Sequence, residues 1–160
     1  RVAAACLVLL GLLAGLWFLW PTKPNPEALY AEYYASPAIP EQMGLEGAAI
    51  LRAAYADFEA GAFAAASDKF TLALTDSSLE GRSLAQLFYG LSLMEEGQTE
   101  AALQAFEKSD QHPEQRDWYT AMLYLKTENW ELLKPLLQRI IETPGHYFAP
   151  KAKALAETIE

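Results

Sequence analysis

The feature that most constrains this chain is a segment at residues 84–108 whose pattern predicts two helices folded back on each other. Apolar residues recur at helical spacing before Gly97, and a second such stripe, including Phe106, follows it. Gly97 lies between the two stripes, where the chain has to turn. Gly90 lies on the first helix and has no side chain, so a neighbouring helix can approach it closely. The segment therefore predicts an antiparallel helical hairpin.

The same pattern recurs on both sides of this segment. A shift of 36 residues places Gly61 in the position of Gly97, and a shift of 31 residues places Glu128 there and Ala121 in the position of Gly90. Such self-similarity is typical of repeat architectures. We therefore predict three pairs of helices and one final helix, at residues 42–60 and 63–75, 79–96 and 99–110, 115–127 and 130–142, and 147–159.

On these residues the chain resembles the tetratricopeptide repeat (TPR) family, whose unit is a helix, a turn and a helix of about 34 residues. Ala54, Gly61, Ala66 and Phe70 occupy motif positions in the first copy, and the resemblance covers residues 46–142. Asp57 stands where the motif usually has an apolar residue. The resemblance implies an all-α fold, in which a right-handed stack of helical hairpins ends in a C-terminal capping helix.

The resemblance also implies a concave groove lined by the first helix of each pair, with Glu59, Glu95 and Lys126 at its rim. The residues expected to face it are apolar: Leu51, Tyr55, Phe58, Leu84, Leu87, Leu91, Met94, Trp118, Met122 and Leu125. An apolar strip of this length is rarely left open. Either the Tyr-rich segment at residues 30–34 folds back into it, or a helix or peptide of another protein fills it.

The N-terminal segment predicts a transmembrane helix at residues 1–20. Val2 to Trp20 is an uncharged run of nineteen residues, about 28 Å at helical rise and enough to cross a bilayer. Trp17 and Trp20 lie at its end, where aromatic rings favour the membrane interface. Gly11 and Gly15 form a GxxxG pair, which allows close contact with another membrane helix. A cleaved signal peptide is the alternative interpretation.

The remaining organisation is a Pro-rich juxtamembrane linker with a short Tyr-rich helix at residues 21–40, followed by the helical domain at residues 41–160. Arg1 is the only charge before the apolar run, so the positive-inside rule places the C-terminal domain outside. The layout is similar to that of single-pass envelope TPR proteins of bacteria. This implies an inner-membrane anchor with the C-terminal domain in the periplasm.

No residue pattern predicts catalysis. The chain has a net charge of −9, which disfavours nucleic acid because phosphates are bound mainly by Lys and Arg. The two histidines, His112 and His146, both fall in predicted connectors, without the spacing of a metal site. No glycine-rich phosphate loop is present. We therefore expect no enzyme activity, cofactor, metal site or small-molecule substrate.

These features predict a membrane-anchored protein–protein interaction module that acts as a scaffold or accessory subunit of a membrane protein complex. The expected partners are other membrane or envelope proteins, bound through the groove and the membrane helix, together with the lipid bilayer. A chaperone-like holder of exported polypeptides is the alternative, because methionine and aromatic side chains suit varied clients.

Overall fold

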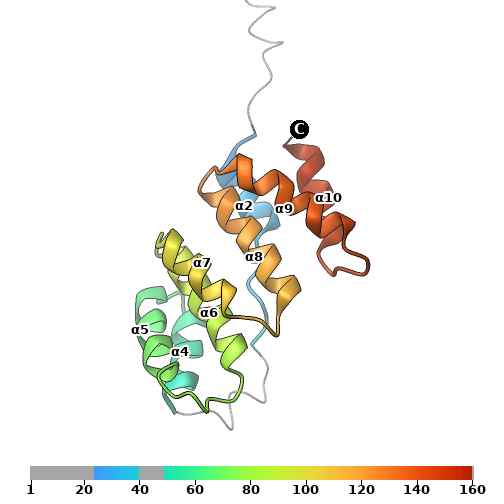
Figure 1. The fold of residues 1–160 in the computed structure, drawn as a ribbon. Helices are drawn as coiled ribbons and strands as arrows, with labels where there is room; N and C mark the ends of the chain where they lie inside the picture. The colour runs from blue at the N-terminus through green and yellow to red at the C-terminus, as the bar shows by residue number, and fades with distance from the viewer. Residues whose placement is uncertain (1–23, 40–48, 160) are drawn as a thin grey trace, which may run out of the picture.

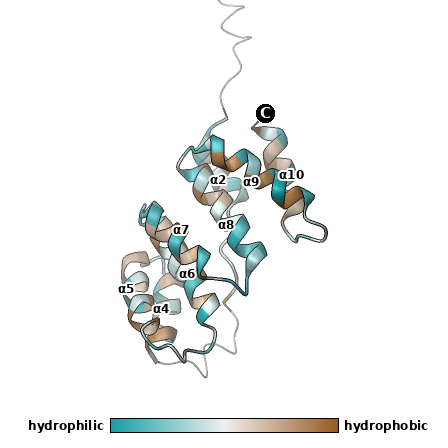
Figure 2. Ribbon diagram, in the orientation of Figure 1, coloured by the Kyte–Doolittle hydropathy of each residue, from teal (hydrophilic) through white to brown (hydrophobic). Residues whose placement is uncertain are grey.

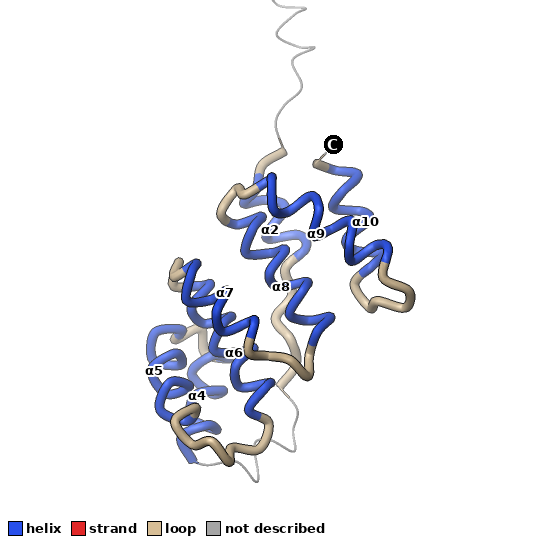
Figure 3. The backbone as a smooth tube through the Cα atoms, viewed as in Figure 1, coloured by secondary structure: helices blue, strands red, loops and turns tan. Residues whose placement is uncertain are grey.

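The computed structural model describes residues 24–39 and 49–159, and these ranges contain helices and no strand (Figure 1; Figure 3). The predicted all-α class is confirmed. The eight helices of these ranges are α2 (Pro26–Tyr33), α4 (Ala49–Glu59), α5 (Phe63–Ala73), α6 (Arg82–Glu95), α7 (Thr99–Glu107), α8 (Pro113–Lys126), α9 (Trp130–Glu142) and α10 (Ala149–Thr158).

Consecutive helices pack as antiparallel pairs: α4 with α5, α6 with α7, and α8 with α9, while α10 packs on α9. The first two pairs are joined through α5 and α6. The contact between α7 and α8 is less extensive, and α2, from the start of the chain, packs against α8. Figure 1 accordingly shows two groups, α4 to α7 below and α8 to α10 with α2 above.

The three pairs share one turn geometry. The turn residues Gly61, Gly97 and Glu128 have φ of 73°, 78° and 54°, and they are 36 and 31 residues apart, as in the sequence alignment. In each turn the next amide donates to a carbonyl five residues earlier, at 2.8 Å. This is the bond that closes a helix ending in a left-handed residue. Because all three turns repeat it, the repeat in the sequence is also a repeat of backbone conformation.

Aromatic rings join the first two pairs. Phe88 of α6 lies edge-on to Tyr55 and to Phe58 of α4, with ring centroids 5.0 Å apart in each case. Tyr55 also lies edge-on to Phe70 of α5 at 5.2 Å. All four rings are buried, so one continuous core runs through these helices. Figure 2 shows hydrophilic and hydrophobic stretches alternating along the helices, which suits elements that bury one face.

Most helix bounds differ from the predicted ones by one to three residues. The helix predicted at 79–96 begins instead at Arg82, directly after Gly81, because Gly81 has a left-handed φ of 68° that a helix cannot continue through. Only part of the helix predicted at 42–60 lies in the described ranges, where α4 starts at Ala49. Pro135 lies inside α9.

None of the described helices is long and apolar enough to cross a membrane. The predicted transmembrane helix at residues 1–20 lies outside the described residues, together with Gly11, Gly15, Trp17 and Trp20.

Candidate interaction surface

The residues predicted to line the groove are all buried. Leu84 is the most exposed at 7 %, and the others are at 5 % or less: Leu51, Tyr55, Phe58, Leu87, Leu91, Met94, Trp118, Met122 and Leu125. They come from α4, α6 and α8, as the alignment implies. Their burial means that they form no open apolar strip in this structure.

Part of the cover is a segment of the same chain, residues 26–39, which we name the strap. It consists of α2 and the non-helical residues 34–39. Tyr34 stacks on Tyr30 with ring centroids 4.9 Å apart, and lies edge-on to Tyr119 of α8 at 6.1 Å. The Tyr119 hydroxyl donates a hydrogen bond of 2.8 Å to the Ala35 carbonyl. The sequence left two candidates for covering the groove, the Tyr-rich segment of the same chain and another protein. Over α8, the segment of the same chain is present.

A polar cluster fastens the strap to the C-terminal ends of α6 and α8. Glu95 accepts a hydrogen bond from the Tyr30 hydroxyl and pairs with the Lys126 ammonium at 2.6 Å. That ammonium also lies 4.9 Å from the centre of the Tyr30 ring, within the range of a cation–π contact. Because the Glu95 and Lys126 side chains are only 16 % and 31 % exposed, water screens this cluster less than it would a surface pair.

The pKa values of two strap tyrosines and of Tyr119, which contacts the strap from α8, are raised. Burial raises the pKa of Tyr30, Tyr34 and Tyr119 above the usual value of 10.0. For Tyr30, the hydrogen bond to Glu95 and the negative charge of that carboxylate raise the pKa further. The three hydroxyls therefore stay protonated well into the alkaline range, and the hydrogen bonds donated by Tyr30 and Tyr119 persist there.

The strap leaves one cavity of about 470 Å³ beside it. Strap residues 35–38 form one wall, Leu84 and Leu87 of α6 form another, and Tyr119, Tyr147 and Phe148 lie around the rest. Tyr147 is 76 % exposed and thus presents an apolar ring to solvent. The strap, α6, α8 and the residues before α10 therefore meet around this cavity.

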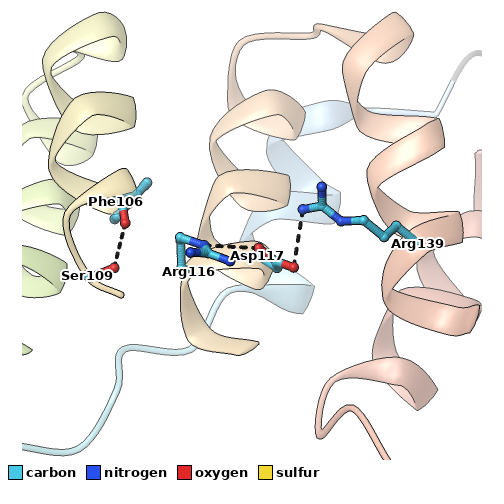
Figure 4. Close-up of polar contacts among 5 residues, drawn as sticks. All are labelled: Phe106, Ser109, Arg116, Asp117 and Arg139. Carbon is cyan, nitrogen blue, oxygen red and sulfur yellow. Dashed lines mark hydrogen bonds and ion pairs between the residues drawn. The ribbon is translucent and has the colours of Figure 1, made fainter. Parts of the chain in front are cut away.

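Asp117 makes two ionic contacts, one within α8 and one with α9, and neither was predicted from the sequence. Asp117 of α8 accepts from Arg116 Nε at 3.2 Å and pairs with Arg139 of α9 at 3.2 Å (Figure 4). In the same view, the Ser109 hydroxyl donates to the Phe106 carbonyl at 2.7 Å, beyond the end of α7. Nothing in the spacing of Asp117 and Arg139 along the chain signals their contact.

The histidines lie apart from any cluster that could hold a metal. His146 is buried, and its Nδ1 accepts from the Phe148 amide at 3.2 Å. His112 lines the cavity beside the strap. No group of three His, Cys, Asp or Glu in the described ranges is arranged to hold a metal ion.

In the described ranges, the helical pairs and the strap form an all-α domain in which a segment of the same chain lies on α8. In comparisons with known proteins, no family model, curated protein or solved structure matches the chain.

Proposed function

We propose that this chain is a TPR-like module that binds other proteins beside a membrane, as a scaffold or accessory subunit of a membrane protein complex. The observation that carries the proposal is the strap. Helix α8 holds a non-helical stretch of polypeptide through the edge-on contact of Tyr119 with Tyr34 and the bond from Tyr119 to the Ala35 carbonyl. A surface that takes such a stretch has the shape and polarity to take an extended segment of another protein.

The TPR-like assignment is supported by the turns. Gly61, Gly97 and Glu128 recur at intervals of 36 and 31 residues with the same left-handed conformation. These intervals bracket the TPR unit of about 34 residues. Pairs of helices repeated in this way commonly serve as binding surfaces rather than as catalytic scaffolds.

The membrane part of the proposal rests on residues 1–20, whose apolar run is long enough to span a bilayer. Gly11 and Gly15 would contact a partner's membrane helix, and Trp17 and Trp20 would lie at the interface. In a bacterium the anchor would lie in the inner membrane and the helical domain in the periplasm. A variant without residues 1–20 should then appear in the soluble fraction, and its retention in washed membranes would contradict the anchor.

Site-specific photo-crosslinking in intact membranes tests the interaction. A photoreactive residue replaces Tyr147, which is 76 % exposed beside the cavity, and in a matched control it replaces Leu72 of α5, which is 58 % exposed. We expect one partner protein to be linked from position 147 at a constant ratio and none from position 72. No product from position 147, or equal products from both positions, would overturn the proposal.

A holder of exported polypeptides would give many linked clients at low yield from position 147. The structure does not favour that function over a subunit with one partner. Met94 and Met122, whose flexible side chains motivated it, are fully buried.

A further inference from the structure

A second cavity lies on the outer side of the first two pairs, away from the strap. It measures about 280 Å³, is open to solvent, and is lined by residues of α5, α6 and α7 and of the segments that follow α5 and α7. We name it the outer cavity. Arg82, Gln86 and Tyr89 of α6 line it. Their spacing places them on one face of that helix, opposite Leu84 and Leu87, which line the cavity beside the strap. The two cavities are therefore separate.

The outer cavity is positively charged in an acidic protein. Arg82 and Lys108 line it, and no Asp or Glu does, although the chain has a net charge of −9. Neither cation forms a salt bridge within the described residues. Arg82 Nη1 donates to the Asp76 carbonyl at 2.8 Å, which orients the guanidinium and leaves other N–H groups available.

Asp76 is an acidic residue whose negative charge opposes the positive charge of Arg82. Its carboxylate interacts electrostatically with Arg82. However, it accepts hydrogen bonds from the Ser78 amide at 2.9 Å and the Ser78 hydroxyl at 2.7 Å, and those bonds lower its pKa. Asp76 does not line the cavity, so the two cations outnumber it there.

The wall of the outer cavity carries an unsatisfied polar group. Gln86 is 6 % exposed, and its amide oxygen is buried without a hydrogen-bond partner among the described residues. A buried amide oxygen without a partner is costly, because it has given up its bonds to water. Since the two ends of a glutamine amide can exchange places by rotation, Gln86 can offer a ligand either a donor or an acceptor.

We propose that the outer cavity binds a small oxyanion, a carboxylate or phosphate compound held by Arg82, Lys108 and the Gln86 amide. Charge-assisted hydrogen bonds from a guanidinium and an ammonium are the ordinary means of holding such groups. The volume of about 280 Å³ equals that of roughly nine water molecules, which suits a multi-atom anion better than a chloride ion. This binding is independent of the proposed interaction surface, because it uses the opposite face of α6.

Titration of the full-length, nitrogen-15-labelled chain with citrate or inorganic phosphate tests the proposal, at an ionic strength held constant with sodium chloride. The Gln86 side-chain amide and Arg82 Nε–H should shift with saturation for at least one anion. The anion that saturates identifies the group as a carboxylate or a phosphate. Shifts that stay linear, or that are equal at exposed lysines throughout the chain, would mean an adventitious ion only and would overturn the proposal.

Variants localise the effect. Arg82→Gln and Lys108→Gln should each weaken binding about tenfold or more, whereas Lys134→Gln, at an exposed lysine of α9, should leave it unchanged. Gln86→Leu separates a binding role from a structural one. It removes the unsatisfied amide, so the melting temperature should hold or rise while the Arg82 response is lost. A Gln86→Leu chain that binds citrate or phosphate like the wild type would overturn the assignment.

Discussion

Gly90 of α6 faces the ring of Phe106 of α7 so closely that a Cβ atom added at Gly90 would lie 2.5 Å from ring atoms Cδ1 and Cε1. Phe106 is 1 % exposed, so its ring has little room to move. The equivalent positions in the other two pairs, Ala54 and Ala121, are fully buried but carry a methyl group. The middle pair is therefore packed more closely at this position than the others can be.

Gly90→Ala should lower the free energy of unfolding. Overpacking costs about 1–3 kcal/mol, which outweighs the roughly 1 kcal/mol that alanine gains over glycine within a helix. Urea denaturation measures the difference. In a Phe106→Leu background the same change should cost less, because the clashing ring is gone. A Gly90→Ala chain at least as stable as the wild type would show that α6 and α7 can separate freely.

Glu128→Gly should stabilise the chain. Glu128 has a φ of 54°, and a left-handed conformation costs a residue with a side chain about 1–2 kcal/mol. Part of that gain is lost to the greater freedom of glycine in the unfolded state, so we expect a net gain of about 0.5–1 kcal/mol. Glu96, an exposed residue in a right-handed conformation at the end of α6, is the matched control. Glu96→Gly should give no gain in the same thermal melts.

Tyr119→Phe should loosen the strap without unfolding the helical pairs. It removes the hydroxyl that donates to Ala35, and a hydrogen bond of this kind contributes about 1 kcal/mol. Hydrogen exchange of residues 26–39, followed by mass spectrometry, should then become about fivefold faster. Tyr124→Phe, on the same helix and outside the strap contact, serves as the control. Unchanged exchange in Tyr119→Phe would mean that this hydrogen bond does not hold the strap, and that its ring contacts and the Tyr30–Glu95–Lys126 cluster do.

Stability should fall as the pH rises above 10. Burial raises the pKa of Tyr34, Tyr55 and Tyr119 above the usual 10.0. Above pH 10 the unfolded chain therefore loses protons that the folded chain keeps, which favours unfolding as the pH rises. Each such tyrosine adds a slope of up to about 1.4 kcal/mol per pH unit, and below pH 10 the effect vanishes.

Denaturation midpoints measured between pH 8 and pH 11.5 test this expectation. Tyr34→Phe should make the alkaline decline shallower, because one shifted group is gone. Tyr147→Phe, at a ring that is 76 % exposed, is the matched control. Equal slopes in the wild type and in Tyr34→Phe would show that the strap tyrosine ionises as readily in the folded chain as in the unfolded one.

Local pattern accounts for what could be predicted about the fold. Helical spacing of apolar residues predicted the paired helices, and the alignment placed Glu128 at a turn where it does adopt the conformation of Gly61 and Gly97. The bounds were less accurate. Gly81, with its φ of 68°, delays the start of α6 to Arg82, and apolar periodicity does not register that single residue.

The candidate site was predictable only in part, because its contacts join residues far apart in the chain. Outside the site, Asp57, which departs from the repeat motif, pairs with Lys69 across the first hairpin. Tyr30 and Glu95 are 65 positions apart, and Ala35 and Tyr119 are 84 apart. The sequence named the Tyr-rich segment as one possible cover for the groove and left another chain as the alternative.

By itself, then, the sequence determined the helices, their pairing and the turns, since each depends on residues within a few positions of one another. Only the tertiary structure decided that the predicted groove residues are buried, that the strap lies on α8, and that a cationic cavity opens behind α6. Those outcomes depend on which distant surfaces exclude water from each other. Side-chain periodicity along one helix sets which face is apolar, but it carries no information about what that face will meet.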